Sequence, residues 1–396
     1  MSDGIIVINA GSSSIKFSLY VGGNGSEPHL LNKGQIEGIG VAPTFTAKTP
    51  DGKGLADAKW DPHISHDDLF SHMLDWIEHH LDGAELKAAG HRVVHGGRHF
   101  SGPTLINEQV LTELDKLVPL APLHQSHNLD PIRTLARLHP GLPQVACFDT
   151  SFHTTNDTLA TMFAVPRWLS DEGVRRYGFH GLSYEYISHR LRSVDPSLAK
   201  GKVIVCHLGS GASMCAIENG HSVASTLGFT AVDGLPMGTR TGALDPGVVL
   251  YLLQEKNMDA KQIETLLYKQ SGLLGISGIS NDMRVLMQSS DPHAKEAVDY
   301  FIYRICREMG SLAASMGGVD GVIFTAGIGE HSPELRALVL EQCRWLGLGV
   351  DPSLNTNGEG RISPSLSKPV YVIPTDEELM IAMHTRRMLT QKAAAE

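Results

Sequence analysis

The segment VINAGSSSIKFSLY, residues 7–20, places one glycine and three serines between two β-rich runs, with Lys16 at the start of the second run. Two short apolar runs separated by small turn residues are typical of a β-hairpin. A well-known phosphate-binding loop has the pattern GxxxxGK followed by Ser or Thr, and this pattern does not occur in the chain. A turn that combines backbone N–H groups, hydroxyls and an ammonium group suits a phosphoryl group.

The chain contains this segment twice. VIVCHLGSGASMCAIE, from Val203, aligns without a gap on IIVINAGSSSIKFSLY, from Ile5, and pairs Gly209 with Gly11. The offset is 198 residues, half of the chain's 396. Either copy alone would be an ordinary hairpin with a serine-rich turn. Two copies half a chain apart predict two duplicated domains, whose turns hold a phosphate chain.

Length and charge narrow the class of protein. A chain of 396 residues exceeds the size at which single cores stop growing, so two domains are expected. Hydrophobic residues make up 42% and charged residues 19%, which is a globular composition. The formal net charge of −10 gives no overall attraction to nucleic acid or anionic membranes. An anionic substrate therefore needs a local cluster of cations.

Cysteine usage and the N-terminus bear on the compartment. The cysteines form no CxxC pair, and four of the five lie in apolar stretches. The chain passes from Met1 into a predicted strand and has no apolar run of the roughly 18 residues that a membrane helix needs. We therefore expect a reduced, cytoplasmic protein without a secretion signal or membrane span. The cysteines are Cys147, Cys206, Cys215, Cys306 and Cys343.

Strands alternate with helices in each half, which is typical of α/β proteins. Residues 65–81 and about 293–316 carry apolar residues at helical spacing; the second stripe is core or subunit interface. Asp245 precedes a proline, as Ser332 does, and each pair marks a helix start. Residues 369–389 are expected to form a strand, an acidic turn and a closing helix that returns to the first domain.

Polar groups follow several predicted strands. GHRVVHGG ends in glycines after Arg92, and an apolar strand ends at Asp149. In α/β sheets ligands bind at the carboxyl ends of strands. FTAGIGEH, residues 324–331, is predicted as a strand end and a glycine loop, into which the next helix directs free N–H groups.

Ten motifs in order, from Asn9 to Glu377, resemble the acetokinase family within the actin and hexokinase superfamily. The resemblance implies two duplicated ribonuclease H-like α/β domains with a central cleft. Residues 1–150 and 378–396 would form the N-terminal domain, and residues 151–377 a C-terminal domain for nucleotide binding and dimer contact. The motifs are NAGSSSIKF, HRVVHGG, APLH, FDTSFH, RRYGFHGLSYEY, HLGSGAS, LPMGTRTGALDPG, SNDMR, FTAGIGEHS and TDEELMIA.

The resemblance also implies an activity. Members transfer the γ-phosphoryl group of ATP to acetate, reversibly and in line, giving acetyl phosphate and ADP, with Mg²⁺ or Mn²⁺. They are homodimers of organic acid metabolism with no nucleic-acid or membrane partner. By similarity, the metal residues are Asn9 and Glu377; those around the phosphoryl group are Arg92, His124, Asp149, His180 and Arg240. The nucleotide residues are Lys16, Ser12, His207, Leu208, Gly209, Ser210, Gly211, Asp282, Met283, Arg284, Gly327, Ile328, Gly329, Glu330 and His331. The acid pocket comprises Arg92, Val94, Leu123, Phe179 and Ala231.

The chemistry suits these residue types. A carboxylic acid with a pKa of about 4.3 is ionised at neutral pH, so no base is needed to create the nucleophile. Two anions 4 Å apart repel by about 4 kcal/mol at an effective dielectric constant of about 20. Arg92 and Arg240 would reverse that repulsion, although a surface salt bridge is the ordinary role of an arginine. Asp149 need remove no proton, so we expect it to orient an arginine or a metal-bound water. His180 and His124 would donate to phosphoryl oxygens; for His124 a structural role remains equally open.

Three positions depart from the family pattern. Ser210 and His331 stand where the family usually has asparagine, and Ala231 where it has proline. Alanine is smaller than proline, so Ala231 leaves room in the acid pocket for a longer acid. One methylene changes the discrimination between two acids by only about 1–3 kcal/mol. We hypothesise acetate as the main substrate with appreciable use of propionate.

The alternatives are a propionate, butyrate or sugar kinase of the same superfamily, and a non-catalytic actin-like nucleotide-binding module. Paired arginines favour a carboxylate acceptor over a sugar hydroxyl, which would need a base and fewer cations.

Overall fold

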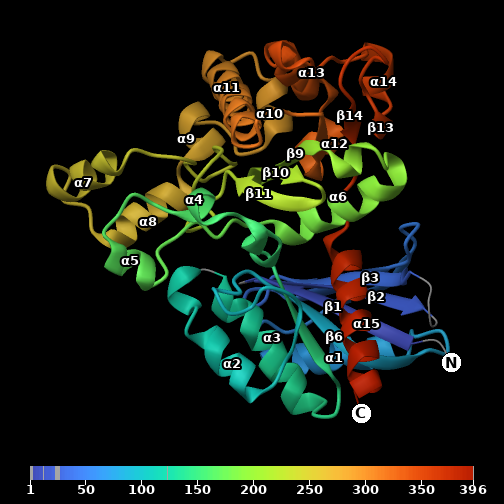
Figure 1. Cartoon of the computed structure of the whole chain (residues 1–396). Coiled ribbons are helices and arrows are strands. Elements are labelled where there is room, and N and C mark those ends of the chain that lie inside the picture. Colours follow the sequence, from blue (N-terminus) through green and yellow to red (C-terminus); the bar gives the residue numbers. More distant parts are fainter. Residues whose placement is uncertain (1–2, 12, 23–26, 123, 396) are drawn as a thin grey trace. The chain divides into compact units, whose positions relative to one another are not determined.

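The chain forms two compact units, Met1–Ser151 with Asp376–Glu396, and Phe152–Thr375 (Figure 1). The computed structural model describes residues 3–11, 13–22, 27–122 and 124–395. Three residues expected in the second domain, Ser151, Asp376 and Glu377, belong to the first unit. The last two do so because the closing helix α15 (Glu377–Ala395) begins there.

Over the described residues, the first unit contains an eight-stranded sheet in the order β5-β4-β3-β2-β1-β6-β8-β7. The expected hairpin is present, because β1 and β2 are antiparallel and pair Ala10 with Ile15. The strands are β1 (Asp3–Ala10), β2 (Ser14–Gly22), β3 (His29–Glu37), β4 (Thr44–Lys48), β5 (Gly54–Lys59), β6 (Glu85–Val93), β7 (Thr104–Leu105) and β8 (Gln144–Phe148). The helices besides α15 are α1 (His66–Glu78), α2 (Glu108–Asp115) and α3 (Gln125–Leu138).

The second unit contains a six-stranded sheet in the order β11-β10-β9-β12-β14-β13. The strands are β9 (Lys202–Leu208), β10 (Ala212–Glu218), β11 (His221–Ser225), β12 (Gly321–Thr325), β13 (Gly360–Arg361) and β14 (Val370–Val372). The helices are α4 (Thr158–Thr161), α5 (Arg167–Asp171), α6 (Gly181–Val194), α7 (Pro246–Gln254), α8 (Ala260–Lys269), α9 (Gly272–Ser277), α10 (Met283–Gln288), α11 (Pro292–Ser315), α12 (Ala326–His331), α13 (Pro333–Gln342) and α14 (Pro352–Thr356).

The two sheets repeat one topology. The order β3-β2-β1-β6-β8 in the first unit corresponds to β11-β10-β9-β12-β14 in the second. In each, the first strand is antiparallel to its hairpin partner and parallel to the strand on its other side. β2 begins at Ser14 and β10 at Ala212, at the offset of 198 residues found in the sequence. The predicted pair of duplicated α/β domains is therefore confirmed.

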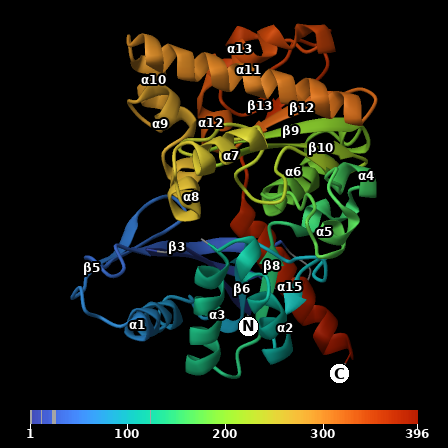
Figure 2. The same cartoon turned by 90° about the vertical axis from the view of Figure 1, so that its left-hand side faces the viewer.

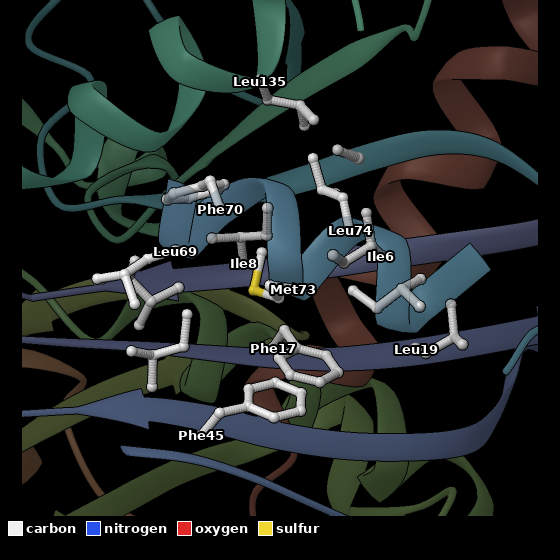
Figure 3. Close-up of a cluster of buried hydrophobic side chains, with 14 of the residues drawn as sticks. Ile6, Ile8, Phe17, Leu19, Phe45, Leu69, Phe70, Met73, Leu74 and Leu135 are labelled. Carbon is white, nitrogen blue, oxygen red and sulfur yellow. The ribbon is translucent and has the colours of Figure 1, made fainter. Parts of the chain in front are cut away.

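The first unit's sheet is covered by helices on both faces. The side chain of Ser65 caps α1 by accepting from Asp68 N, and the apolar face of α1 packs on β1 to β4 (Figure 3). Figure 2 shows α3 on the same side as α1. α15 covers the other face, where a Cβ on Gly90 would lie only 2.6 Å from Ile381 Cγ2. Each large apolar side chain buried in this way contributes about 1.5–3 kcal/mol.

The second unit's long helix, α11, is a core element. Asp291 caps it through His293 N, and Pro292 takes the first helical position. The apolar stripe predicted as core or subunit interface is buried within the unit. Figures 1 and 2 show α11 beside the sheet, where it contacts β9, β10 and β11. The stripe consists of Val298, Phe301, Ile302, Ile305, Met309, Leu312 and Met316.

The prediction of a glycine loop after β12 is wrong, because these residues form the short helix α12. The Glu330 carboxylate accepts from Ala326 N at 2.7 Å and from Thr375 N at 3.1 Å. Ala326 takes a left-handed φ of 64°. A side chain that satisfies N–H groups at the start of the turn stabilises a helix where glycines favour a loop. α13 begins at Pro333, as expected.

The cysteines are free thiols; Cys306 is half-buried and the other four are buried. Among the described residues, no helix combines the length and the apolar character needed to cross a membrane.

Candidate active site

An arginine and two carboxylates meet at one edge of the first unit's sheet. Arg92 lies near the end of β6 and Asp149 directly follows β8, and these strands are adjacent and parallel. Arg92 donates from Nε to Asp149 Oδ1 at 3.0 Å and from Nη2 to Oδ2 at 2.6 Å. Glu377 Oε2, at the start of α15, lies 3.8 Å from Arg92 Nε. The fold thus brings three of the predicted residues together.

This cluster carries excess negative charge. Burial raises the pKa of Glu377 to about 7 against the attraction of Arg92, and the charges of Asp149, Glu378 and Asp376 raise it further. A carboxyl group of this kind is stabilised in its ionised form by an added cation.

The donor chemistry of the cluster fits a divalent metal. Mg²⁺ usually binds one or two carboxylates together with substrate phosphates and waters. Asn9, the other predicted metal residue, lies near the end of β1 opposite Lys16. The part of the chain that the structure describes has no group of three or more His, Cys, Asp or Glu side chains placed to hold a metal by itself.

Two other predicted residues of the first unit are Val94, directly after β6, and His124, at the start of α3. Val94 donates its N–H to Asn128 Oδ1 at 3.0 Å, and Asn128 Nδ2 donates to Ala10 O at 2.8 Å. Asn128, which sequence reasoning missed, therefore joins the two strand ends. His124 is the half-buried N-cap residue of α3 and makes no side-chain capping bond.

Ser12 and Leu123, predicted for the nucleotide and for the acid pocket, lie outside the described residues.

In the second unit, three predicted side chains converge on the β9–β10 turn. The imidazoles of His180 and His207 stack with centroids 4.3 Å apart and planes 21° apart. A Cβ on Gly211 would lie 3.3 Å from His180 Nε2 and 3.9 Å from Arg240 Nη1, so glycine lets both groups approach the turn. His180 has a left-handed φ of 56°, a strain that clusters at functional sites.

Two expected pocket residues lie close to these groups along the chain. Phe179 is buried, and its carbonyl accepts from His153 Nε2 at 2.9 Å, which anchors the backbone beside His180. The carbonyl of Ala231 accepts from Arg240 Nη1 at 3.1 Å. Sequence reasoning did not single out His153.

A cavity of about 780 Å³ opens beside the same turn. The three predicted nucleotide segments all contribute to it. Two of them lie together because β9 and β12 are adjacent parallel strands, and the third is the start of α10. The predicted residues that line it are Gly209, Ser210, Asp282, Met283, Arg284, Gly327, Ile328 and His331; Asn281, Met287, Gln288, Ser332 and Glu334, which sequence reasoning missed, complete the lining. Its volume suits a nucleotide.

Five of the nucleotide residues predicted in the second unit do not line this cavity, and neither does Lys16, which lies on β2 of the first unit. Leu208 is fully buried in its strand, the His207 ring stacks on His180, and the Glu330 carboxylate faces backbone N–H groups. The remaining two are Gly211 and Gly329.

The duplicated sheets and this cavity define a two-domain protein of the actin/hexokinase-like fold. A profile of the acetokinase family matches residues 4–383. The chain belongs to the acetokinase family.

Known proteins resemble the chain over nearly its whole length. It is 54% identical over 395 residues to acetate kinase from Rhodopseudomonas palustris, covering 98% of this chain and 99% of that protein. A propionate kinase structure from Francisella tularensis superposes with a TM-score of 0.91 at 36% identity, covering 97% of this chain and 99% of the other. An acetate kinase structure from Porphyromonas gingivalis gives 0.89 at 36% identity, covering 98% and 100%.

Proposed function

We propose that this protein is an acetate kinase, which transfers the γ-phosphoryl group of ATP to acetate, reversibly, giving acetyl phosphate and ADP. The identity of 54% to the Rhodopseudomonas palustris acetate kinase, over 98% of this chain, carries the proposal. The cavity at the β9–β10 turn supports ATP as the donor, because its walls come from the segments expected to bind a nucleotide.

The residues proposed to act on the reaction are those that the family resemblance implies. Arg92 and Arg240 offset the repulsion between the acetate carboxylate and the phosphoryl group. The phosphoryl group is then transferred to the carboxylate in line. Asp149 holds the Arg92 guanidinium at two points, so its role is to orient that side chain rather than to remove a proton. Within the second unit, the side chains of His180 and Arg240 lie close to Gly211 of the β9–β10 turn.

A divalent cation, Mg²⁺ or Mn²⁺, would neutralise phosphate charge when bound. Asn9 and Glu377 are the proposed ligands from the chain, and the raised pKa of Glu377 supports a cation beside that carboxylate.

Ala231 is proposed to widen the acid pocket. The likeness to a propionate kinase structure, at 36% identity, agrees with use of a longer acid. We predict that kcat/KM for acetate exceeds that for propionate by less than about 200-fold, because one methylene contributes at most that much. The Ala231→Pro variant should raise the ratio by lowering turnover of propionate. A wild-type ratio of several hundred, or an unchanged ratio in the variant, contradicts a widened pocket.

We infer that the protein is a homodimer of the cytoplasm. α7 contains no buried residue, and Val248, Leu250 and Leu253 are between 39% and 53% exposed, which supports a second copy as the cover. The free cysteines support a reducing compartment. Light scattering of the purified chain should give twice the mass of one chain.

A hydroxamate assay tests the function directly. With ATP, Mg²⁺ and acetate the chain should form acetyl phosphate, trapped as the hydroxamate, and propionate and butyrate should react more slowly. A non-catalytic nucleotide-binding module would form none, and a sugar kinase would use neither acid. Arg240→Gln should lose most of the activity, whereas Arg344→Gln, at a 69% exposed side chain paired with Glu341, serves as the matched control.

A further inference from the structure

A chain of hydroxyl groups stands behind the ring of His180. His180 Nδ1 lies 2.8 Å from Ser213 Oγ, and the same oxygen lies 2.5 Å from the Tyr184 hydroxyl. Ser213 and Tyr184 are both fully buried, so water does not compete for these bonds. Ser213 has one proton to share between its two neighbours.

His207 has an equivalent arrangement. Its Nδ1 lies 2.8 Å from Ser183 Oγ, which lies 2.9 Å from Thr375 Oγ1. The ring of His207 stacks on that of His180. Two stacked imidazoles, each with a serine on Nδ1 and a second hydroxyl beyond it, form a matched pair of relays beside one turn.

The acidity of the groups sets the direction of the first relay. A phenol, with a pKa of about 10, is a stronger acid than an aliphatic alcohol, so Tyr184 donates to Ser213. The serine proton then goes to Nδ1 of His180, which acts as acceptor. A neutral imidazole whose Nδ1 accepts carries its proton on Nε2.

Nε2 is the atom that faces the turn. His180 Nε2 lies 3.3 Å from the Cβ position of Gly211, and His207 Nε2 lies 4.0 Å from that of Gly209. In the Nε2–H tautomer both rings present donors there, whereas the other tautomer presents lone pairs that repel a phosphoryl oxygen. Two cations about 4 Å apart would repel by about 4 kcal/mol at an effective dielectric constant of about 20, so two neutral donors are favoured over two imidazolium ions.

We propose that Ser213 with Tyr184, and Ser183 with Thr375, are positioning residues that hold His180 and His207 as Nε2–H tautomers aimed at the transferring phosphoryl group. The role of the tautomers rests on the proposed kinase function. The tautomer of His180 follows from its contacts within the second unit. That of His207 is inferred from the matching arrangement and from its stacking on His180.

Nitrogen NMR of the full-length protein, labelled at histidine, tests the proposal without substrate. His180→Gln and His207→Gln variants assign the signals, and both rings should show Nε2–H in the wild type. Ser213→Ala should shift the population of His180 toward Nδ1–H and leave His207 unchanged, and Ser183→Ala should do the reverse. Ser188→Ala is the control. It removes another buried hydroxyl of α6, one that donates to Gly220 O, and should change the tautomer of neither ring.

Kinetics separate positioning from structural support. Ser213→Ala should lower kcat about ten-fold, part of the effect of losing one transition-state donor, and leave KM for ATP and for acetate unchanged. Tyr184→Phe keeps the ring and lets Ser213 accept as well as donate, so kcat should fall less. If Ser213→Ala does not fold, Tyr184→Phe provides the same test through a mixed His180 tautomer.

An Nδ1–H tautomer of His180 in the wild type, or an unchanged tautomer in both variants, overturns the proposal. A wild-type chain that forms no acetyl phosphate overturns the kinase function instead, and the NMR result then still decides whether the relays exist.

Discussion

Asp149 and Arg92 form a two-point ion pair in which the carboxylate is almost fully buried. Removing its charge leaves the guanidinium with Glu377 as its nearest carboxylate, at 3.8 Å. In the Asp149→Asn variant we expect the Arg92 side chain to turn toward Glu377. The guanidinium then competes with the metal for the Glu377 carboxylate. Turnover should fall, and half-maximal turnover should need a higher concentration of Mg²⁺.

A magnesium titration of the initial rate measures this effect, and a curve that matches the wild type refutes the orienting role of Asp149. The same variant should lose about 3 kcal/mol of unfolding free energy, because one partner of a buried pair is removed. Asp115→Asn is the control: its ion pair with Arg133 is half exposed, so the loss should stay below about 1 kcal/mol.

At the scale of elements, Arg336 of α13 stabilises α12, the helix that lines part of the nucleotide cavity. Its side chain is fully buried, and every hydrogen bond that the structure gives it goes to an uncharged oxygen. It donates to Gly329 O and Glu330 O, both at 2.8 Å, and to Asn355 Oδ1 and O at 2.9 and 2.7 Å. One planar guanidinium thus ties the end of α12 to α14.

The Arg336→Lys variant should loosen α12, because an ammonium group is a point donor that cannot span these four oxygens. We expect KM for ATP to rise about ten-fold, which corresponds to about 1.4 kcal/mol, with KM for acetate unchanged. Steady-state kinetics with each substrate varied in turn measure the difference. Arg344→Lys, at an exposed ion pair, should change neither constant. Equal effects on both substrates would indicate general destabilisation instead.

Elements whose ends are set by neighbouring residues were predictable from the sequence. Ser65 caps α1 through a residue three positions away, and Asp245 begins α7 in the same local manner. The β9–β10 hairpin followed from its duplicate in the first half. α12 was not predictable, because the Glu330 carboxylate that stabilises it also binds Thr375, 45 residues further along the chain.

The same distinction holds within the candidate site. Glycines and charged groups at strand ends were visible in the sequence because they stand next to recognisable turns. Ser213, Tyr184 and Asn128 were not singled out, since each acts through a contact between distant segments. Nothing in the sequence near a buried serine indicates that it faces an imidazole.

At the scale of the whole molecule, buried histidines make stability depend on pH. Burial lowers the pKa of His91 to about 4, against a weaker opposing effect of Gln144, and burial lowers that of His95 to about 4 as well. In the unfolded chain a histidine titrates near 6.5. The unfolded state therefore binds more protons between these values, so stability is complete above about pH 6.5 and falls as the pH drops toward 4.

His91 alone should contribute a loss of about 3 kcal/mol across that window. Urea unfolding at pH 7, 5.5 and 4.5 measures it, and the His91→Leu variant should lose less stability than the wild type between the first and last pH. His63→Gln, at an exposed position, should follow the wild-type profile. A wild-type midpoint that does not move between pH 7 and 4.5 contradicts the prediction.

The first unit is discontinuous in sequence, since it needs residues 376–396 as well as 1–151, whereas the second is a single segment. α15 supplies Met380, Ile381 and Ala382, all buried in the first unit. The two larger apolar side chains contribute about 1.5–3 kcal/mol each, which is a large share of the stability of a domain.

A chain that ends at Thr375 should therefore keep a folded second unit and lose the first. Trp76 reports on the first unit, because its ring lies 5.6 Å from that of Phe45 in the core; its emission should shift to that of an exposed indole in the truncated chain. A chain that ends at Thr390 retains the buried part of α15 and should keep the native emission. If the shorter chain also keeps it, α15 is not needed to complete the first unit, and the first 151 residues fold without the end of the chain.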